Sequence, residues 1–306
     1  MRIAQLGHGR WGATLRRAFE SLDGVELVLV CDPDEAARAR SPVETASDAE
    51  AAFARSDVDA IVIATPPELH HEHACAALRA GKHVFVEKPL ALAVDDAQEL
   101  VTLAARGGRT LMVGHVVLFD EAAQWIKRFL DAGGLGEVQR ASFHRTGRQR
   151  ADRTVGALWN LAPHDVSLAD YWFGGAPSEV EAFGWSSRPD GLEEESLVRW
   201  RYARGPEIDI RVGWLARDGA RRAVLVGSDS TVVYETAPQT RLTVYRAGTA
   251  QIVELAPREP LRVEVEHFVE SIRGGWAPLS DGESGLRVVS TLAAARRCLS
   301  FEPLAS

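Results

Sequence analysis

Short apolar runs alternate with amphipathic segments over the first 118 residues. The runs have the length of buried strands, and the segments between them have the spacing of helices. The apolar runs lie at 3–6, 26–31, 59–64, 83–86 and 110–113, and the helical segments at 34–40, 48–55, 70–80 and 95–106. Strands that alternate with helices predict a parallel sheet that is covered on both faces.

From Phe119 onward the pattern changes, and strands follow one another directly. A helix is expected at 120–130. Strand candidates then lie at 137–145, 178–186, 196–203, 207–215, 222–226, 230–235, 241–246 and 250–255, and further helices at 166–173, 261–273 and 284–299. Successive strands without intervening helices predict an antiparallel sheet. We therefore expect an α/β domain over residues 1–118 and, over residues 119–306, an α+β domain with a large, mainly antiparallel sheet.

A glycine-rich turn, Gly7-His8-Gly9-Arg10-Trp11-Gly12, joins the first apolar run to the first helix. Gly7 permits a tight turn, Gly9 lets the backbone approach a pyrophosphate, and Gly12 allows close packing of helix on strand. The helix N-terminus offers N–H groups to the anion. A lone G-x-G-x-x-G pattern is often an ordinary glycine turn. Here a second strand ends just before Asp32, so the pattern predicts a Rossmann domain that binds a dinucleotide.

Asp32 also indicates which dinucleotide is bound. Its carboxylate would accept hydrogen bonds from the ribose hydroxyls of NAD and would repel the 2′-phosphate of NADP. The next residue, Pro33, brings no cation, and Arg38 and Arg40 are expected a helical turn or more from the ribose. We predict NAD as the cofactor, with NADP possible.

Bulk composition excludes several classes of protein. The chain has 306 residues, 46% of them hydrophobic, and a net charge of −8, which argues against broad nucleic-acid binding. Its three cysteines have neither a disulfide framework nor C-x-x-C spacing. No apolar stretch approaches the ~20 residues of a membrane span, and the N-terminus lacks the layout of a signal peptide. We expect a cytoplasmic protein that contacts neither membrane nor nucleic acid.

Three further segments carry a family resemblance: ATPPELHHEHACAALRAGKHVFVEKPLA at 64–91, MVGHVVLFDEAAQWIKRFLDAGGLGEV at 112–138, and WNLAPHDVSLADYWFGG at 159–175. With the glycine turn, they resemble the Gfo/Idh/MocA oxidoreductases. That resemblance implies an NAD(P)-dependent dehydrogenase or reductase of sugars, nucleotide sugars or cyclitols, assembled as a homodimer or homotetramer. The W-N-x-A-P-H-D segment resembles a branch found in nucleotide-sugar pathways.

Lys88 is the first catalytic candidate. The triplet Glu87-Lys88-Pro89 follows a buried strand, and open α/β sheets place their ligands at the carboxyl ends of such strands. The proline restricts the conformation of Lys88. A lysine at this edge can hydrogen-bond a substrate oxygen and stabilise negative charge that develops on it. The alternative is a solvated surface lysine.

His164 is the second catalytic candidate, because histidine titrates near neutrality and can take the hydroxyl proton. The alternative is a structural histidine. Many members of the resembled family have an aspartate four residues earlier, where this chain has Asn160. Asparagine can orient the ring or bind substrate but brings no charge, and Asp165 can supply part of it. We assign Asn160 to the catalytic and substrate sites, and His164 and Asp165 also to substrate binding.

The histidine-rich segment at 70–75 raises the question of a metal site. His70 and His73, and His71 and Cys75, have helical spacing, but the two pairs face different directions and no further ligand is evident. We therefore predict no metal. The resemblance places His70 in the turn near the nicotinamide. His115 follows the last strand of the first domain at the crevice, where we expect it to contact substrate or cofactor. The predicted cofactor-binding residues are Gly7, Gly9, Arg10, Trp11, Gly12, Asp32, Thr65, Pro66, Pro67, His70, Glu87 and Lys88.

An arginine-rich segment between Arg140 and Arg153 stands out in this acidic chain. Arginine suits the two-point binding of phosphate or carboxylate, so we expect an anionic substrate bound by Arg145 and Arg148. The alternative is a solvated strand edge or a subunit contact. Two other functions also stay open: an NAD(P)-binding regulator without turnover, and a glycosidase in which NAD is oxidised and reduced within one cycle. The presence of both Lys88 and His164 argues against the regulator.

Overall fold

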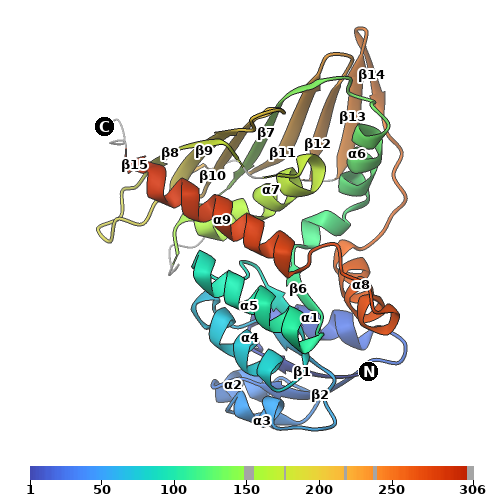
Figure 1. Ribbon diagram of the computed structural model, residues 1–306, viewed down its shortest axis with the longest axis vertical. Helices are drawn as coiled ribbons and strands as arrows, with labels where there is room; N and C mark the ends of the chain where they lie inside the picture. The colour runs from blue at the N-terminus through green and yellow to red at the C-terminus, as the bar shows by residue number, and fades with distance from the viewer. Residues whose placement is uncertain (148–154, 176, 217–218, 237–239, 302–306) are drawn as a thin grey trace. The chain divides into compact units, whose positions relative to one another are not determined.

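The computed structural model describes residues 1–147, 155–175, 177–216, 219–236 and 240–301 (Figure 1). They form two compact units. The first comprises Met1–Phe119 and Glu259–Val289, and the second comprises Asp120–Arg258 and Ser290–Ser306. The predicted division after residue 118 assigns residues 259–289 to the second domain, whereas their contacts group them with the first unit, because helix α8 (Pro260–Gly274) packs on α1 (Arg10–Glu20).

The first unit is built on a six-stranded parallel sheet. Its strands are β1 (Arg2–Leu6), β2 (Glu26–Cys31), β3 (Thr45–Ala46), β4 (Ala60–Ile63), β5 (His83–Glu87) and β6 (Leu111–Gly114), in the order β3-β2-β1-β4-β5-β6. The predicted parallel sheet is confirmed. The order reverses between β1 and β4, which is where Rossmann folds bind dinucleotides, at the carboxyl ends of the strands.

Helices cover this sheet. Besides α1 and α8 they are α2 (Glu35–Arg38), α3 (Glu50–Phe53), α4 (His70–Arg79) and α5 (Val94–Gly107), with the 3-10 turns η1 (Pro67–Leu69) and η2 (Val116–Phe119). α4 packs against α5. Under α1 and α8, the rings of Phe19, Phe85 and Phe268 meet edge to face, and the centroids of Phe85 and Phe268 are 5.6 Å apart. Phe268 therefore anchors α8 on strand β5.

The second unit contains a nine-stranded mixed sheet. Its strands are β7 (Val138–Thr146), β8 (Glu179–Trp185), β9 (Glu195–Arg201), β10 (Glu207–Gly213), β11 (Ala220–Gly227), β12 (Thr231–Glu235), β13 (Arg241–Arg246), β14 (Thr249–Ile252) and β15 (Leu299–Phe301), in the order β14-β13-β12-β11-β7-β10-β9-β8-β15. β7 pairs with β10 and β8 with β15 in parallel, and the other neighbours are antiparallel. The predicted α+β architecture is confirmed. The prediction missed β15 because it continued the last helix to residue 299.

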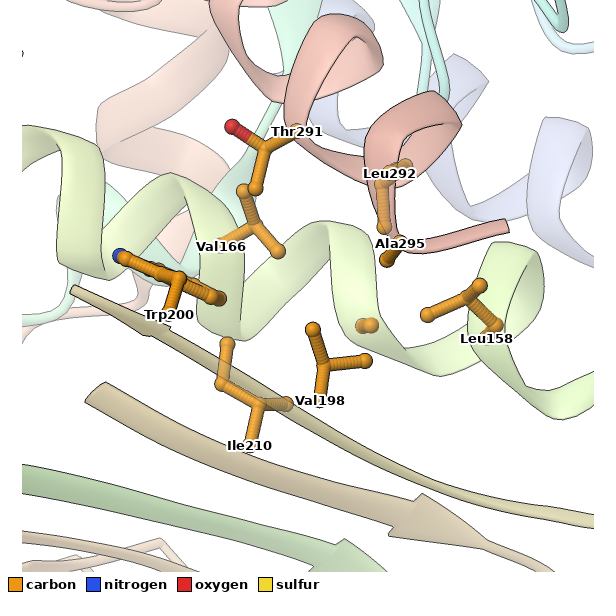
Figure 2. A pocket seen from close by; sticks show the side chains of 9 residues that line it. Leu158, Val166, Val198, Trp200, Ile210, Thr291, Leu292 and Ala295 are labelled. Atoms are coloured by element: carbon orange, nitrogen blue, oxygen red, sulfur yellow. The ribbon is translucent and has the colours of Figure 1, made fainter. Parts of the chain in front are cut away.

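Helix α7 (Ala157–Phe173) and the end of α9 (Gly282–Cys298) pack against this sheet, with α6 (Glu121–Asp131) beside α7. Figure 2 shows apolar side chains of α7 and α9 over Val198, Trp200 and Ile210 of the sheet. The prediction began this helix at residue 166, and a proline such as Pro163 normally ends or kinks a helix. The helix instead continues through Pro163, whose ring is buried, so apolar burial outweighs the lost backbone hydrogen bond.

Within the described part of the chain, no helix combines the length and the apolar character that crossing a membrane requires.

Candidate active site

The glycine turn between β1 and α1 has the backbone that its sequence predicts. Gly7 has φ +86°, and a Cβ atom there would lie 2.5 Å from the Ala64 carbonyl oxygen. A Cβ on Gly12 would lie 2.3 Å from the Gly7 carbonyl oxygen. At Gly9, by contrast, a Cβ would meet no atom of the described residues within 4 Å. Packing thus requires glycine at the first and third positions, and the open space above Gly9 fits the approach of a pyrophosphate to the N-terminus of α1.

Asp32 is fixed beside this turn. Its Oδ2 accepts a hydrogen bond from the backbone N–H of His8 at 2.6 Å, and its Oδ1 accepts one from the N–H of Asp34 at 2.9 Å. The carboxylate is thereby held at the end of β2, where Rossmann folds bind the adenosine ribose. These residues fit the adenosine half of NAD.

Two arginines lie closer to the Asp32 turn than the sequence predicted. Arg38 donates to the carbonyl oxygens of Asp32 and Pro33 at 2.8 and 2.9 Å, and Arg40 reaches the His8 carbonyl oxygen at 3.5 Å. The expectation that both lie a helical turn or more away is wrong. α2 has only four residues, so the chain folds back toward β2 within one turn.

Glu87 ends strand β5 and is held by three neighbours. Its Oε1 accepts a hydrogen bond from the Trp11 indole Nε1–H at 2.6 Å, which ties the glycine turn to β5. Its carboxylate lies against Gly114, where a Cβ would be 2.8 Å from Oε1. Burial raises the pKa of Glu87 to about 7, although the Trp11 hydrogen bond and the charge of Lys88 act in the opposite direction. This carboxyl therefore titrates near neutral pH.

Lys88 follows directly at the carboxyl end of β5 and is half-buried. The Lys88–Pro89 peptide bond is cis, and the Lys88 backbone N–H contacts Glu87 Oε2 at 3.3 Å. The ammonium group therefore comes from the strand end at which an open α/β sheet binds its ligands, beside a carboxyl that is already engaged by Trp11. This geometry allows Lys88 to donate a hydrogen bond to a ligand oxygen.

His70 connects the two turns next to this strand end. Its Nδ1 lies 2.7 Å from the Pro89 carbonyl oxygen and its Nε2 lies 3.0 Å from the Thr65 carbonyl oxygen. The ring is buried, and burial lowers its pKa. His70 thus holds the turn Thr65-Pro66-Pro67 against the turn that carries Lys88, so its contribution to a cofactor site is made through those two backbones.

His115 follows β6 and is fully buried. Within the described residues neither ring nitrogen has a hydrogen-bond partner. Burial, and secondarily the charge of Lys88, lowers the pKa of His115 to about 3, so its ring is neutral at physiological pH. A neutral imidazole offers one donor and one acceptor, and the contact of this buried ring with a ligand stays a prediction.

The histidine-rich helix α4 gains a partner from α5. His71 Nε2 lies 3.4 Å from Cys75 Sγ and 3.0 Å from Glu99 Oε2, and the ligand atoms of these three residues lie within 4.8 Å of one another. Arg79 also binds Glu99 at 2.7 Å and neutralises its charge. The sequence prediction missed Glu99 because it comes from a different helix, and the absence of a metal stays a prediction.

In the second unit, α7 carries Asn160 and His164 in one continuous helix. Both are partly exposed, and their spacing of four residues places them on the same helix face. This corrects the expectation that His164 begins a helix. Asp165, the next residue, is buried and faces β7, where it binds Arg145 through two hydrogen bonds, Nε–Oδ2 at 2.9 Å and Nη2–Oδ1 at 2.8 Å.

Two predicted substrate ligands, Arg145 and Asp165, are therefore each other's partner. The side chains are 13% and 5% exposed, so the pair is buried and close to neutral overall. Arg140, at the other end of β7, binds Glu207 at 2.6 Å. Arg148 lies outside the described residues, and its contact with substrate stays a prediction.

Comparisons with known proteins agree with this geometry. The family described as GFO/IDH/MocA oxidoreductases with an NAD-binding Rossmann fold matches residues 1–115, and the C-terminal domain of the same family matches residues 123–233. Together these regions cover well over half of the chain. The resemblance drawn from the sequence motifs is thus confirmed, as is the assignment of the chain to NAD-binding oxidoreductases.

Individual relatives are named for different activities. The chain is 34% identical to inositol 2-dehydrogenase 2 of Saccharopolyspora erythraea, over 95% of this chain and 94% of that protein. It is 31% identical to 2,7-anhydro-N-acetylneuraminate hydratase of Mediterraneibacter gnavus, over 59% of this chain and 51% of that protein. Three curated relatives, this hydratase among them, are covered over only 51% to 59% of their length.

A solved structure shares the fold. UDP-N-acetylglucosamine 3-dehydrogenase GnnA from Acidithiobacillus ferrooxidans matches with a TM-score of 0.89 and 24% sequence identity, over 98% of this chain and 97% of that chain. At this identity the match supports the architecture of the two units.

Proposed function

This chain belongs to the Gfo/Idh/MocA family of NAD-binding oxidoreductases, and from that premise we propose that it is a dehydrogenase or reductase of a sugar, a nucleotide sugar or a cyclitol. NAD, when bound, supplies the hydride acceptor or donor. The proposal rests on one observation: Lys88 stands at the carboxyl end of β5, beside the Glu87 carboxyl that Trp11 ties to the glycine turn.

Lys88 would polarise the reacting oxygen of the substrate. Its ammonium group can donate a hydrogen bond to that oxygen and stabilise the negative charge that develops on it as the hydroxyl proton is removed. Glu87 lies next to Lys88, whose charge opposes the rise that burial causes in the pKa of Glu87. Such an interaction is made chiefly in the transition state, so its loss is expected to lower kcat and kcat/KM together.

His164 would take the proton of the hydroxyl group, and Asn160 would orient the ring or the substrate. Support comes from their shared face on α7 and their partial exposure. An anionic substrate stays part of the proposal. Because Asp165 already neutralises Arg145, the attraction of an anion depends mainly on Arg148. The homo-oligomeric state and the cytoplasmic location stay predictions from the sequence.

A screen of inositols, sugars and nucleotide sugars with NAD, followed by the absorbance of the reduced nicotinamide, tests the proposal. The proposal is supported if a compound of one of these classes reduces NAD. The rate of that reduction should fall at least about 100-fold in Lys88→Met and should be unchanged in the control variant Lys127→Met. Tight NAD binding without any turnover would instead indicate a regulator. Release of free sugar without net reduction would indicate the redox-mediated glycosidase.

A further inference from the structure

Helices α4 and α5 bring together three side chains that the proposed reaction does not use. His71 and Cys75 are four residues apart on α4 and lie on the same helix face. Glu99 comes from α5, which packs against α4. The Nε2 atom of His71 lies 3.4 Å from Cys75 Sγ and 3.0 Å from Glu99 Oε2, and the ligand atoms of all three residues lie within 4.8 Å of one another. An imidazole, a thiol and a carboxylate are thus grouped between the two helices.

These separations are close to those between the ligands of one zinc ion. A tetrahedral Zn²⁺ site has bonds of about 2.0–2.3 Å, which place its ligand atoms about 3.3–3.6 Å from one another. Small rotations of the three side chains would therefore make room for the ion. Nitrogen, sulfur and carboxylate oxygen also form a donor set that zinc takes, whereas magnesium and calcium prefer oxygen ligands alone.

Two neighbouring side chains are placed as the surroundings of a metal site require. The other ring nitrogen of His71, Nδ1, lies 3.9 Å from the Asp96 carboxylate. A histidine that binds a metal usually directs its second nitrogen to a carboxylate, which fixes the orientation of the ring. Arg79 donates to Oε1 of Glu99 at 2.7 Å and leaves Oε2 facing His71. The carboxylate of Glu99 is therefore held in place while one oxygen stays directed toward the other two ligands.

Charge and access also suit a divalent cation. With Cys75 bound as the thiolate, its charge and that of Glu99 together balance the two positive charges of Zn²⁺, and Asp96 and Arg79 offset each other. The thiol gives its proton to solvent as it binds the metal. The side chains of His71 and Glu99 are 30% and 43% exposed, so an ion can enter from solvent. Cys75 is buried and forms the inner wall of the site.

We propose that His71, Cys75 and Glu99 bind a Zn²⁺ ion that joins α4 to α5, with water as the fourth ligand. This proposal replaces the prediction of no metal, which rested on the two ligands that the α4 segment supplies by itself. The site shares no residue with the proposed reaction, so either can fail without the other. Its structural effect would reach the start of α4, where His70 holds the turns at Thr65 and Pro89 together.

Titration of the metal-free protein with zinc, after removal of any histidine tag, tests the site. We expect one ion per chain, a dissociation constant of about 1 μM or below, and a melting temperature that rises with zinc concentration. His71→Gln and Glu99→Gln should each weaken binding at least about tenfold. His144→Gln and Cys298→Ser, which change exposed residues of the second unit, are the controls and should bind zinc as the wild type does.

Cobalt reports the ligands directly. Co²⁺ bound in place of zinc should give the near-ultraviolet charge-transfer band of a cobalt–thiolate bond, which Cys75→Ser should lose and Cys298→Ser should keep. Since Glu99 is partly exposed, Glu99→Gln is expected to fold normally, and its melting temperature without zinc checks this. Three results would overturn the proposal: no zinc binding by the wild type, equal zinc affinity in wild type and Glu99→Gln, or survival of the thiolate band in Cys75→Ser.

Discussion

Arg145 of β7 and Asp165 of α7 form a buried, two-point ion pair that fastens the helix bearing His164 to the sheet of its own unit. Both residues carry charge, and each was assigned to the substrate from the sequence. Because they bind each other, both residues stabilise the fold, and any contact with substrate would be made by groups that are already paired. It also fixes the orientation of α7 at the position next to His164.

Removing one partner of this pair should destabilise the protein strongly. Asp165→Asn leaves the Arg145 charge buried without a counter-charge, and we expect a loss of about 3 kcal/mol in the free energy of unfolding. The exposed pair of Lys127 and Asp131 provides the control, since Asp131→Asn should cost far less. Denaturant unfolding measures the free energy of unfolding of both variants. The double variant Arg145→Met with Asp165→Leu should recover most of the loss, and equal losses for Asp165→Asn and Asp131→Asn would contradict the prediction.

His115 should make the folded state sensitive to acid. Its pKa is about 3 in the folded state against 6.5 ordinarily, because burial disfavours the charged ring. The unfolded chain therefore binds a proton that the folded chain does not. The resulting stabilisation is present above about pH 6.5 and is lost as the pH falls.

Between pH 7 and pH 5 this group alone should lower the free energy of unfolding by about 2 kcal/mol. His115→Asn removes the titrating group, so its stability should fall less over the same range. Chemical denaturation of both proteins at the two pH values measures the difference. If the free energy of unfolding falls by the same amount in wild type and in His115→Asn, His115 is not the residue responsible.

Asp32 should control the choice between NAD and NADP. We expect NAD to bind at least about tenfold more tightly, because the carboxylate repels a 2′-phosphate. Asp32→Asn keeps an oxygen that can accept the His8 N–H, but it removes the charge and leaves Arg38 and Arg40 nearby. The ratio of the dissociation constants for NADP and NAD should fall by about tenfold in this variant, as measured by calorimetric titration with each dinucleotide. Tighter binding of NADP by the wild type would refute the assignment.

Asn160 should be coupled to His164 through the helix that they share. Asn160→Asp places a carboxylate one turn before the ring, which favours the protonated imidazole. The apparent pKa that governs kcat/KM on the acidic side should therefore rise by up to about one pH unit. Asp170→Asn, further along α7 on the C-terminal side, serves as a control of charge on the same helix. An unchanged profile in Asn160→Asp would mean that the two side chains act independently.

Local features of the sequence were enough to predict the parallel sheet of the first unit. Five of its strands contain apolar runs that the sequence reveals, because both faces of the sheet are buried. The edge strand β3, Thr45–Ala46, is too short and too exposed to be predicted in this way. The glycine turn could also be located by its spacing, since positive φ at Gly7 and the crowding at Gly12 restrict both positions to glycine. Those signals depend only on neighbours along the chain.

Contacts between distant segments could not be derived in that way. Trp11 and Glu87 are separated by 76 positions, and Arg145 and Asp165 by 20. The sequence names these polar residues but does not reveal which of them bind one another, because partners are set by the packing of helices on sheets. The continuation of α7 through Pro163 was likewise decided by burial, which overrode a local preference.

The sequence by itself determined the class of each unit, the glycine turn and the residues able to perform the chemistry, because periodicity and backbone restriction act locally. Only the tertiary structure decided their environments. It buried Glu264 and His115 without hydrogen-bond partners among the described residues, and it paired Arg145 with Asp165. The charge of a side chain depends on the atoms that replace water around it, and those atoms come from parts of the chain that are remote in sequence.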